Sequence, residues 1–186
     1  MHRKLISLAC LVVVAACDSE KLTEAESGVE RIRENFALYE DVTKAQSAGY
    51  TVWSPDPTVS GSTCPSSVDG RMGYHLVNVP LRGALSNPAA GDAVIDPMRP
   101  EMLLYEKRSD GTVHLVGVEW IVFKAAWERE KGVGAAPPTV FGQALPLGEH
   151  TFVTGVPIIS HYELHAWVFK DNPRGMFDSY NPNVSC

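Results

Sequence analysis

The apolar positions near the start of the chain predict one long helix. From residue 24 to about residue 48, apolar side chains recur at spacings of three and four, which is typical of an amphipathic helix. These positions are Val29, Ile32, Phe36, Tyr39 and Val42. Thr23 and Glu26 have the spacing of a capping box, and Gly49 follows as a stop signal. The apolar stripe has to be covered, so we expect the helix to pack on one face of a sheet.

Four later segments predict the main strands of that sheet, because β-branched and aromatic residues dominate them. They are residues 71–78, 101–107, 112–123 and 161–170, and residues 50–53 could add a short strand. The pair Asp110-Gly111 predicts a tight turn between the second and third of the four. Both faces of residues 112–123 are mostly apolar, with Val113, Leu115, Gly117, Glu119 and Ile121 expected on one of them. This pattern predicts a central strand that is covered on both sides.

Stretches rich in Pro, Gly and Ser separate these segments and predict long irregular loops. We therefore expect an α+β fold with a single antiparallel sheet of about four main strands. The long N-terminal helix packs on one face of this sheet, and the Pro/Gly-rich loops cover much of the other face.

Composition changes this picture little. The chain has 186 residues, of which 45% are hydrophobic and 20% charged, as expected for one globular domain. The formal net charge of −6 provides no basic surface for nucleic acid, which we do not expect as a partner.

The first residues have the pattern of a secretory signal. Arg3 and Lys4 precede a short apolar stretch, residues 5–14, and small residues follow it. The ending Val14-Ala15-Ala16-Cys17 resembles the bacterial lipobox, in which the cysteine carries the lipid and becomes the first mature residue. We expect a signal peptide over residues 1–16, lipidation at Cys17, a tether over residues 17–22 and a single domain over residues 23–186.

The resemblance to a lipobox predicts that the protein is located in the cell envelope. A lipid anchor would hold it to a membrane, with the domain facing the extracytoplasmic side, either the periplasm or the cell surface. The alternative is an ordinary signal peptide cut near Ala16, with Cys17 unmodified.

The two cysteines that remain after Cys17, Cys64 and Cys186, are predicted to form a disulfide, because pairs left over in an oxidising compartment usually bond. Free thiols or metal ligation are the alternatives. A bridge over so long a loop contributes on the order of 3–5 kcal/mol to stability in the loop-entropy model.

Glu119 is the most informative candidate for chemistry. A carboxylate in the middle of an apolar strand needs a cation, hydrogen-bond donors or a metal as its partner. His75 and His165 also lie in the middle of predicted strands, so the three could converge on one face. Two imidazoles and one carboxylate suit Zn²⁺, Cu²⁺ or Fe²⁺ and leave positions open for water or substrate. His161 and Glu163 share a strand face with His165 and are reserve ligands or groups that orient the ligands.

The alternative is a buried polar network that holds the fold together without metal, in a ligand-binding or envelope interaction module that is not an enzyme. The three residues do not form a sequential motif such as His-Glu-x-x-His. A nucleophile elbow, a phosphate-binding loop, a dinucleotide fingerprint and a Cys-x-x-Cys pair are all absent from the sequence. Whether the protein is an enzyme is therefore left open, and acid–base catalysis by Glu119 with a histidine is a weaker third reading.

Several stretches of the chain together resemble a group of uncharacterised bacterial secreted proteins and lipoproteins. The C-terminal stretches that carry the resemblance are Leu164-His165-Ala166-Trp167, Asn172-Pro173-Arg174-Gly175-Met176-Phe177 and Asn181-Pro182-Asn183-Val184-Ser185-Cys186. Earlier ones are Met72-Gly73-Tyr74-His75, Pro100-Glu101-Met102-Leu103-Leu104-Tyr105-Glu106 and Leu115-Val116-Gly117-Val118-Glu119. The resemblance covers nearly all of the mature domain, Cys64 included, and implies a family without an established activity.

Overall fold

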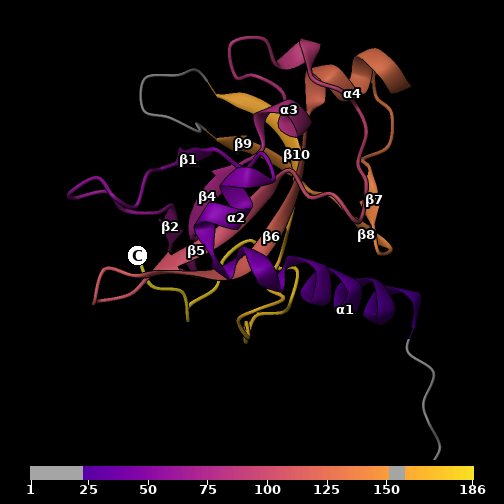
Figure 1. Cartoon of the computed structure of the whole chain (residues 1–186). Helices are drawn as coiled ribbons and strands as arrows, with labels where there is room; N and C mark the ends of the chain where they lie inside the picture. Colours follow the sequence, from indigo (N-terminus) through magenta and orange to yellow (C-terminus); the bar gives the residue numbers. More distant parts are fainter. Residues whose placement is uncertain (1–22, 151–157) are drawn as a thin grey trace, which may run out of the picture.

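The computed structural model describes residues 23–150 and 158–186 (Figure 1). The predicted signal peptide, the lipidation site Cys17 and the tether lie outside the described residues, so all three stay predictions. Within the described residues, no helix is both long enough and apolar enough to cross a membrane.

An antiparallel sheet of six strands forms the centre of the molecule and curves into a half-barrel (Figure 1). Its order is β1 (Val52–Ser54), β4 (Tyr74–Val77), β5 (Met102–Lys107), β6 (Val113–Phe123), β10 (Ile159–Ala166) and β9 (Leu147–His150). The α+β class and the antiparallel sheet are confirmed. The expected number of about four strands is too small, because the short edge strands β1 and β9 extend the sheet on either side.

Smaller elements fill the connections between these strands. They are β2 (Ser66–Ser67) with β3 (Gly70–Arg71), β7 (Thr139–Val140) with β8 (Gln143–Ala144), α3 (Val79–Arg82), η2 (Pro88–Ala90) and α4 (Lys124–Lys131). The regions predicted as loops therefore contain short hairpins and helical turns, whereas α4 lies where residues 125–131 indicate a short helix.

The predicted N-terminal helix is present but interrupted. It consists of α1 (Glu24–Phe36), the 3-10 turn η1 (Ala37–Glu40) and α2 (Val42–Ser47). The capping box of Thr23 and Glu26 is confirmed. The break falls at Asp41, whose backbone is extended and whose carboxylate accepts a hydrogen bond from the N–H of Thr43. Asp41 starts a new helix because a short acidic side chain caps a helix better than it continues one.

One face of the sheet carries the main hydrophobic core. Val29, Ile32 and Phe36 of α1 join buried side chains from the strands in a single cluster. The strand residues of this cluster are Tyr74, Leu76, Leu103, Tyr105, Leu115, Val118, Trp120, Val122, Tyr162, Leu164 and Ala166. The helical segment therefore covers one face of the sheet, as its apolar stripe predicts.

A β-bulge in β6 decides which side chains reach the other face. Leu104 pairs with Gly117 but the next residue, Tyr105, pairs with Leu115, so Val116 is the extra residue. The alternation of faces shifts there by one position. Leu115 therefore joins the core beside Val118, and the sequence-based placement of Leu115 on the face of Glu119 is wrong.

A disulfide between Cys64 and Cys186 ties the C-terminal segment to the loop that follows β1. The two residues are 122 positions apart, and the predicted pairing is confirmed. The backbone N–H of Lys107 also donates to the carbonyl of Ser185, so the last residues lie along the end of β5.

Candidate metal centre

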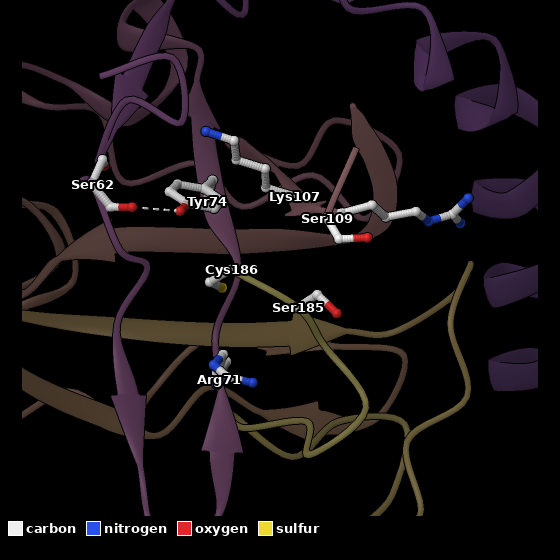
Figure 2. Close-up of a pocket in the computed structure, with 8 residues that line it drawn as sticks. Ser62, Arg71, Tyr74, Lys107, Ser109, Ser185 and Cys186 are labelled. Atoms are coloured by element: carbon white, nitrogen blue, oxygen red, sulfur yellow. Dashed lines mark hydrogen bonds between the residues drawn. The ribbon is translucent and has the colours of Figure 1, made fainter. Parts of the chain in front are cut away.

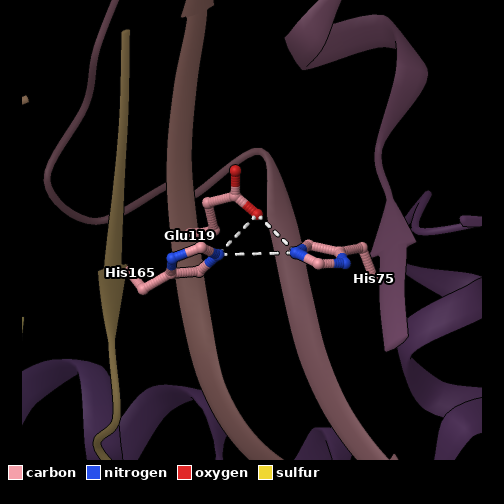
Figure 3. A group of neighbouring side chains, drawn as sticks. All are labelled: His75, Glu119 and His165. Carbon is pink, nitrogen blue, oxygen red and sulfur yellow. Dashed lines mark hydrogen bonds and ion pairs between the residues drawn. The ribbon is translucent and has the colours of Figure 1, made fainter. Parts of the chain in front are cut away.

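The three predicted ligands come from three strands of the sheet and meet on the face opposite the main core. His75 lies on β4, Glu119 on β6 and His165 on β10 (Figure 3). Glu119 and His165 are direct partners in the register of β6 and β10. His75 lies beyond β5, and the two imidazoles approach the carboxylate from opposite sides (Figure 3).

The three nearest ligand atoms form an almost equilateral triangle. Oε2 of Glu119 lies 3.2 Å from Nε2 of His75 and 3.4 Å from Nε2 of His165, and the two nitrogens are 3.4 Å apart. Ligand atoms about 2.0–2.1 Å from a tetrahedral ion are separated from one another by roughly 3.3–3.4 Å. The triangle therefore has the dimensions of one face of a tetrahedral coordination sphere.

The centre is shielded from water. His75 is 8% exposed, and Glu119 and His165 are each 1% exposed. Within the described residues, Oε2 of Glu119 makes no hydrogen bond of good geometry, although two imidazole nitrogens lie close to it. A buried carboxylate oxygen in this state costs free energy unless a further positive group satisfies it.

The electrostatics of the site favour the ionised carboxylate. Burial raises the pKa of Glu119, but the attraction of the protonated forms of His165 and His75 outweighs this effect and lowers the pKa to about 2. The carboxyl group is therefore deprotonated at neutral pH and available as an anionic ligand.

Neighbouring side chains fix the position of His165. Its ring stacks on that of Trp167, with a distance of 5.8 Å between the ring centroids and an interplanar angle of 24°. Gly117, next to Glu119 on the same face, allows β6 and β10 to approach closely, since a Cβ atom there would lie 2.5 Å from the carbonyl oxygen of Ala166.

His161 and Glu163 occupy the same face of β10 but form a separate pair. Nε2 of His161 lies 3.1 Å from Oε2 of Glu163, and its Nδ1 lies 2.6 Å from the carbonyl oxygen of Ile159. Among the described residues, the group whose ligand atoms all lie within 4.8 Å of one another contains His75, Glu119 and His165 only. The roles predicted for His161 and Glu163 as reserve ligands or orienting groups stay predictions.

Two buried charged residues near the centre were not recognised in the sequence as parts of a site. Arg82 at the end of α3 is 5% exposed, and its guanidinium lies over the ring of Phe123. Burial lowers the pKa of Arg82, while the charge of Glu119 acts in the opposite direction. Glu101 precedes β5, and its carboxylate accepts a hydrogen bond from the N–H of Ile121. The positions of Arg82 and Glu101 in the sequence form no known motif with Glu119. Only the folding of the chain brings them near it.

Comparison of the chain with protein-family models, with curated proteins and with solved structures finds no match. The resemblance to a group of bacterial secreted proteins therefore stays a prediction.

Proposed function

We propose that this chain is an extracytoplasmic, lipid-anchored protein that binds a divalent transition metal through His75, Glu119 and His165. The observation that carries the proposal is the triangle of two imidazole nitrogens and one carboxylate oxygen, all buried and 3.2–3.4 Å apart. Three donors of these kinds suit Zn²⁺, Cu²⁺ or Fe²⁺ and leave at least one coordination position for water or a small ligand.

Two features support the proposed location. The disulfide between Cys64 and Cys186 belongs to an oxidising compartment, which in bacteria lies outside the cytoplasm. The sequence before the described domain has the pattern of a signal peptide that ends in a lipobox at Cys17. In this proposal the protein is attached to the membrane only through the lipid on Cys17.

Elemental analysis of the purified full chain tests the metal site. We expect about one equivalent of Zn, Cu or Fe in the wild-type protein and loss of that metal in His165→Ala and in Glu119→Gln. His114→Ala is the matched control, because His114 lies outside the cluster and pairs with the half-exposed Glu40. This variant should keep its metal. Circular dichroism on each variant separates loss of the ligand from loss of the fold.

The second candidate function is a ligand-binding or envelope interaction module in which the same residues are purely structural. It is favoured by the contact between Nε2 of His75 and Nε2 of His165, which lets the two imidazoles bond to one another without an ion. A wild-type protein that takes up none of the three metals, together with a large stability loss in Glu119→Ala, would establish this reading and reject the metal site.

A further inference from the structure

A hollow of about 430 Å³ opens where the hairpin between β5 and β6 meets the C-terminal segment (Figure 2). Its lining includes three cationic side chains, those of Arg71, Lys107 and Arg108. Three hydroxyl-bearing residues, Ser62, Ser109 and Ser185, line it as well. None of these six residues belongs to the proposed metal centre, so the hollow is a separate feature of the molecule.

The charges of two of these cations are not neutralised by a carboxylate. Nη1 of Arg71 donates to the carbonyl oxygen of Val184 at 3.1 Å, and Nζ of Lys107 donates to that of Pro57 at 2.6 Å. Neutral carbonyls orient the cations but leave their charge in place. Among residues 23–150 and 158–186, neither Arg71 nor Lys107 forms an ion pair.

Two carboxylates close to the hollow in the sequence, those of Glu106 and Asp110, have other partners. Glu106 lies 3.5 Å from Nε of Arg108, but its other oxygen accepts a hydrogen bond from Nζ of Lys170 at 2.6 Å. Asp110 turns its carboxylate to the N–H and hydroxyl of Thr112 in its own turn. The described residues that line the hollow include no acidic side chain. The side chains that line the hollow are therefore cationic on balance, with the charges of Arg71 and Lys107 unpaired within the described part of the chain.

The C-terminal segment builds one wall of the hollow. Cys186, held by its disulfide to Cys64, is part of the lining. The backbone N–H of Ser185 donates to Glu106 at 3.1 Å, and its carbonyl accepts from the N–H of Lys107. Bonds to the rest of the fold thus hold the cations Arg71 and Lys107 and the backbone of Ser185 in place before any ligand arrives, which lowers the entropic cost of binding.

We infer that this hollow binds the phosphate or sulfate group of a small, hydroxyl-bearing ligand. Guanidinium and ammonium groups form strong charge-assisted hydrogen bonds with such tetrahedral oxyanions. The volume falls within the range of about 300–1,000 Å³ for small-molecule sites, which leaves room beyond the anion itself. The serine hydroxyls, which can both donate and accept, suit the hydroxyl groups of that remaining part.

Calorimetric titration of the full chain with inorganic phosphate, with sulfate and with glucose 6-phosphate tests the inference. We expect saturable binding of at least one oxyanion, with glucose 6-phosphate tighter than phosphate because its sugar reaches the hydroxyls. Glucose alone should not bind. The double variant Arg71→Gln/Lys107→Gln should lose roughly a hundredfold or more in affinity, since it removes two charge-assisted hydrogen bonds worth about 1.5–3 kcal/mol each.

The double variant Arg31→Gln/Lys44→Gln is the matched control, because it changes the net charge equally at two exposed cations outside the hollow. It should bind as the wild type does. Arg71→Lys/Lys107→Arg keeps both charges and should retain most of the affinity, which separates a charge effect from damage to the fold. Absence of saturable binding for all three oxyanions at millimolar concentration, or an equal loss in the control, would overturn the inference.

Discussion

Glu119 and Glu101 are two buried carboxyl groups whose surroundings shift their pKa values in opposite directions. Glu119 faces His165 and His75, which outweigh the effect of burial and lower its pKa. Glu101 is 3% exposed, and although its carboxylate accepts a hydrogen bond from the N–H of Ile121, burial dominates and raises its pKa well above 4.5. The native state therefore keeps the proton of Glu101 to a higher pH than the unfolded chain does.

Glu101→Gln should stabilise the protein at neutral pH. A raised native pKa means that the contribution of Glu101 is complete below the unfolded-state pKa near 4.5 and is lost as the pH rises toward the native pKa. Over that window, the wild type loses up to about 1.4 kcal/mol of unfolding free energy per pH unit. The Gln side chain still accepts from Ile121 and does not ionise.

Urea unfolding of both proteins from pH 4 to pH 8 measures this difference. The two curves should converge near pH 4 and separate as the pH rises. A variant that is less stable than the wild type at pH 7 would show that the ionised carboxylate stabilises the native state.

At the scale of elements, the contact between β6 and β10 controls the geometry of the metal centre. Gly117 permits this contact, because any side chain at that position meets the carbonyl of Ala166. Ala166 directly follows His165, so a shift of β10 at this point also moves the imidazole.

Gly117→Ala should cost about 1–3 kcal/mol of stability, the usual range for overpacking, and should weaken metal binding as well. Gly111→Ala is its control: a Cβ atom there meets nothing within 4 Å, but the backbone has φ +86°. The control should lose about 1–2 kcal/mol through backbone strain and keep its metal affinity. Competition titration against a chromogenic chelator measures the affinities. Equal metal affinity in the two variants would disprove the role of Gly117.

The elements show which parts of the fold the sequence could predict. The apolar period of three and four marked the helical segment, and residue type marked the four main strands and the possible short strand that is β1. The break at Asp41 was missed because the apolar period continues through it to Val42. The bulge at Val116 was missed because Val, Leu and Gly fit either face of a strand that is buried on both sides.

At the scale of the whole molecule, the candidate site depends on contacts between distant segments. Its three residues were named from the sequence because each is a polar residue inside an apolar strand. Their meeting could not be derived, since His75 and His165 are 90 residues apart and the order β4, β5, β6, β10 is set by the packing of all the strands. Arg82 and Glu101 were missed for the same reason.

The disulfide closes a loop that spans most of the domain. Replacing both Cys64 and Cys186 with Ser should lower the free energy of unfolding by about 3–5 kcal/mol, because the unfolded chain regains the freedom that the bridge removes. Urea unfolding measures the loss, and the wild type treated with dithiothreitol should match the variant. A variant as stable as the oxidised wild type would show that the C-terminal segment needs no covalent tie.

Because β10 comes late in the chain, it determines when the sheet, the disulfide and the candidate metal site can be completed. β9 lies at the edge of the sheet and has no partner there until β10, its neighbour, follows it in the chain. A nascent chain that stops before His165 lacks one ligand and also lacks Cys186. Closure of the disulfide and capture of the proposed metal therefore both have to wait until the segment that follows β9 has joined the sheet.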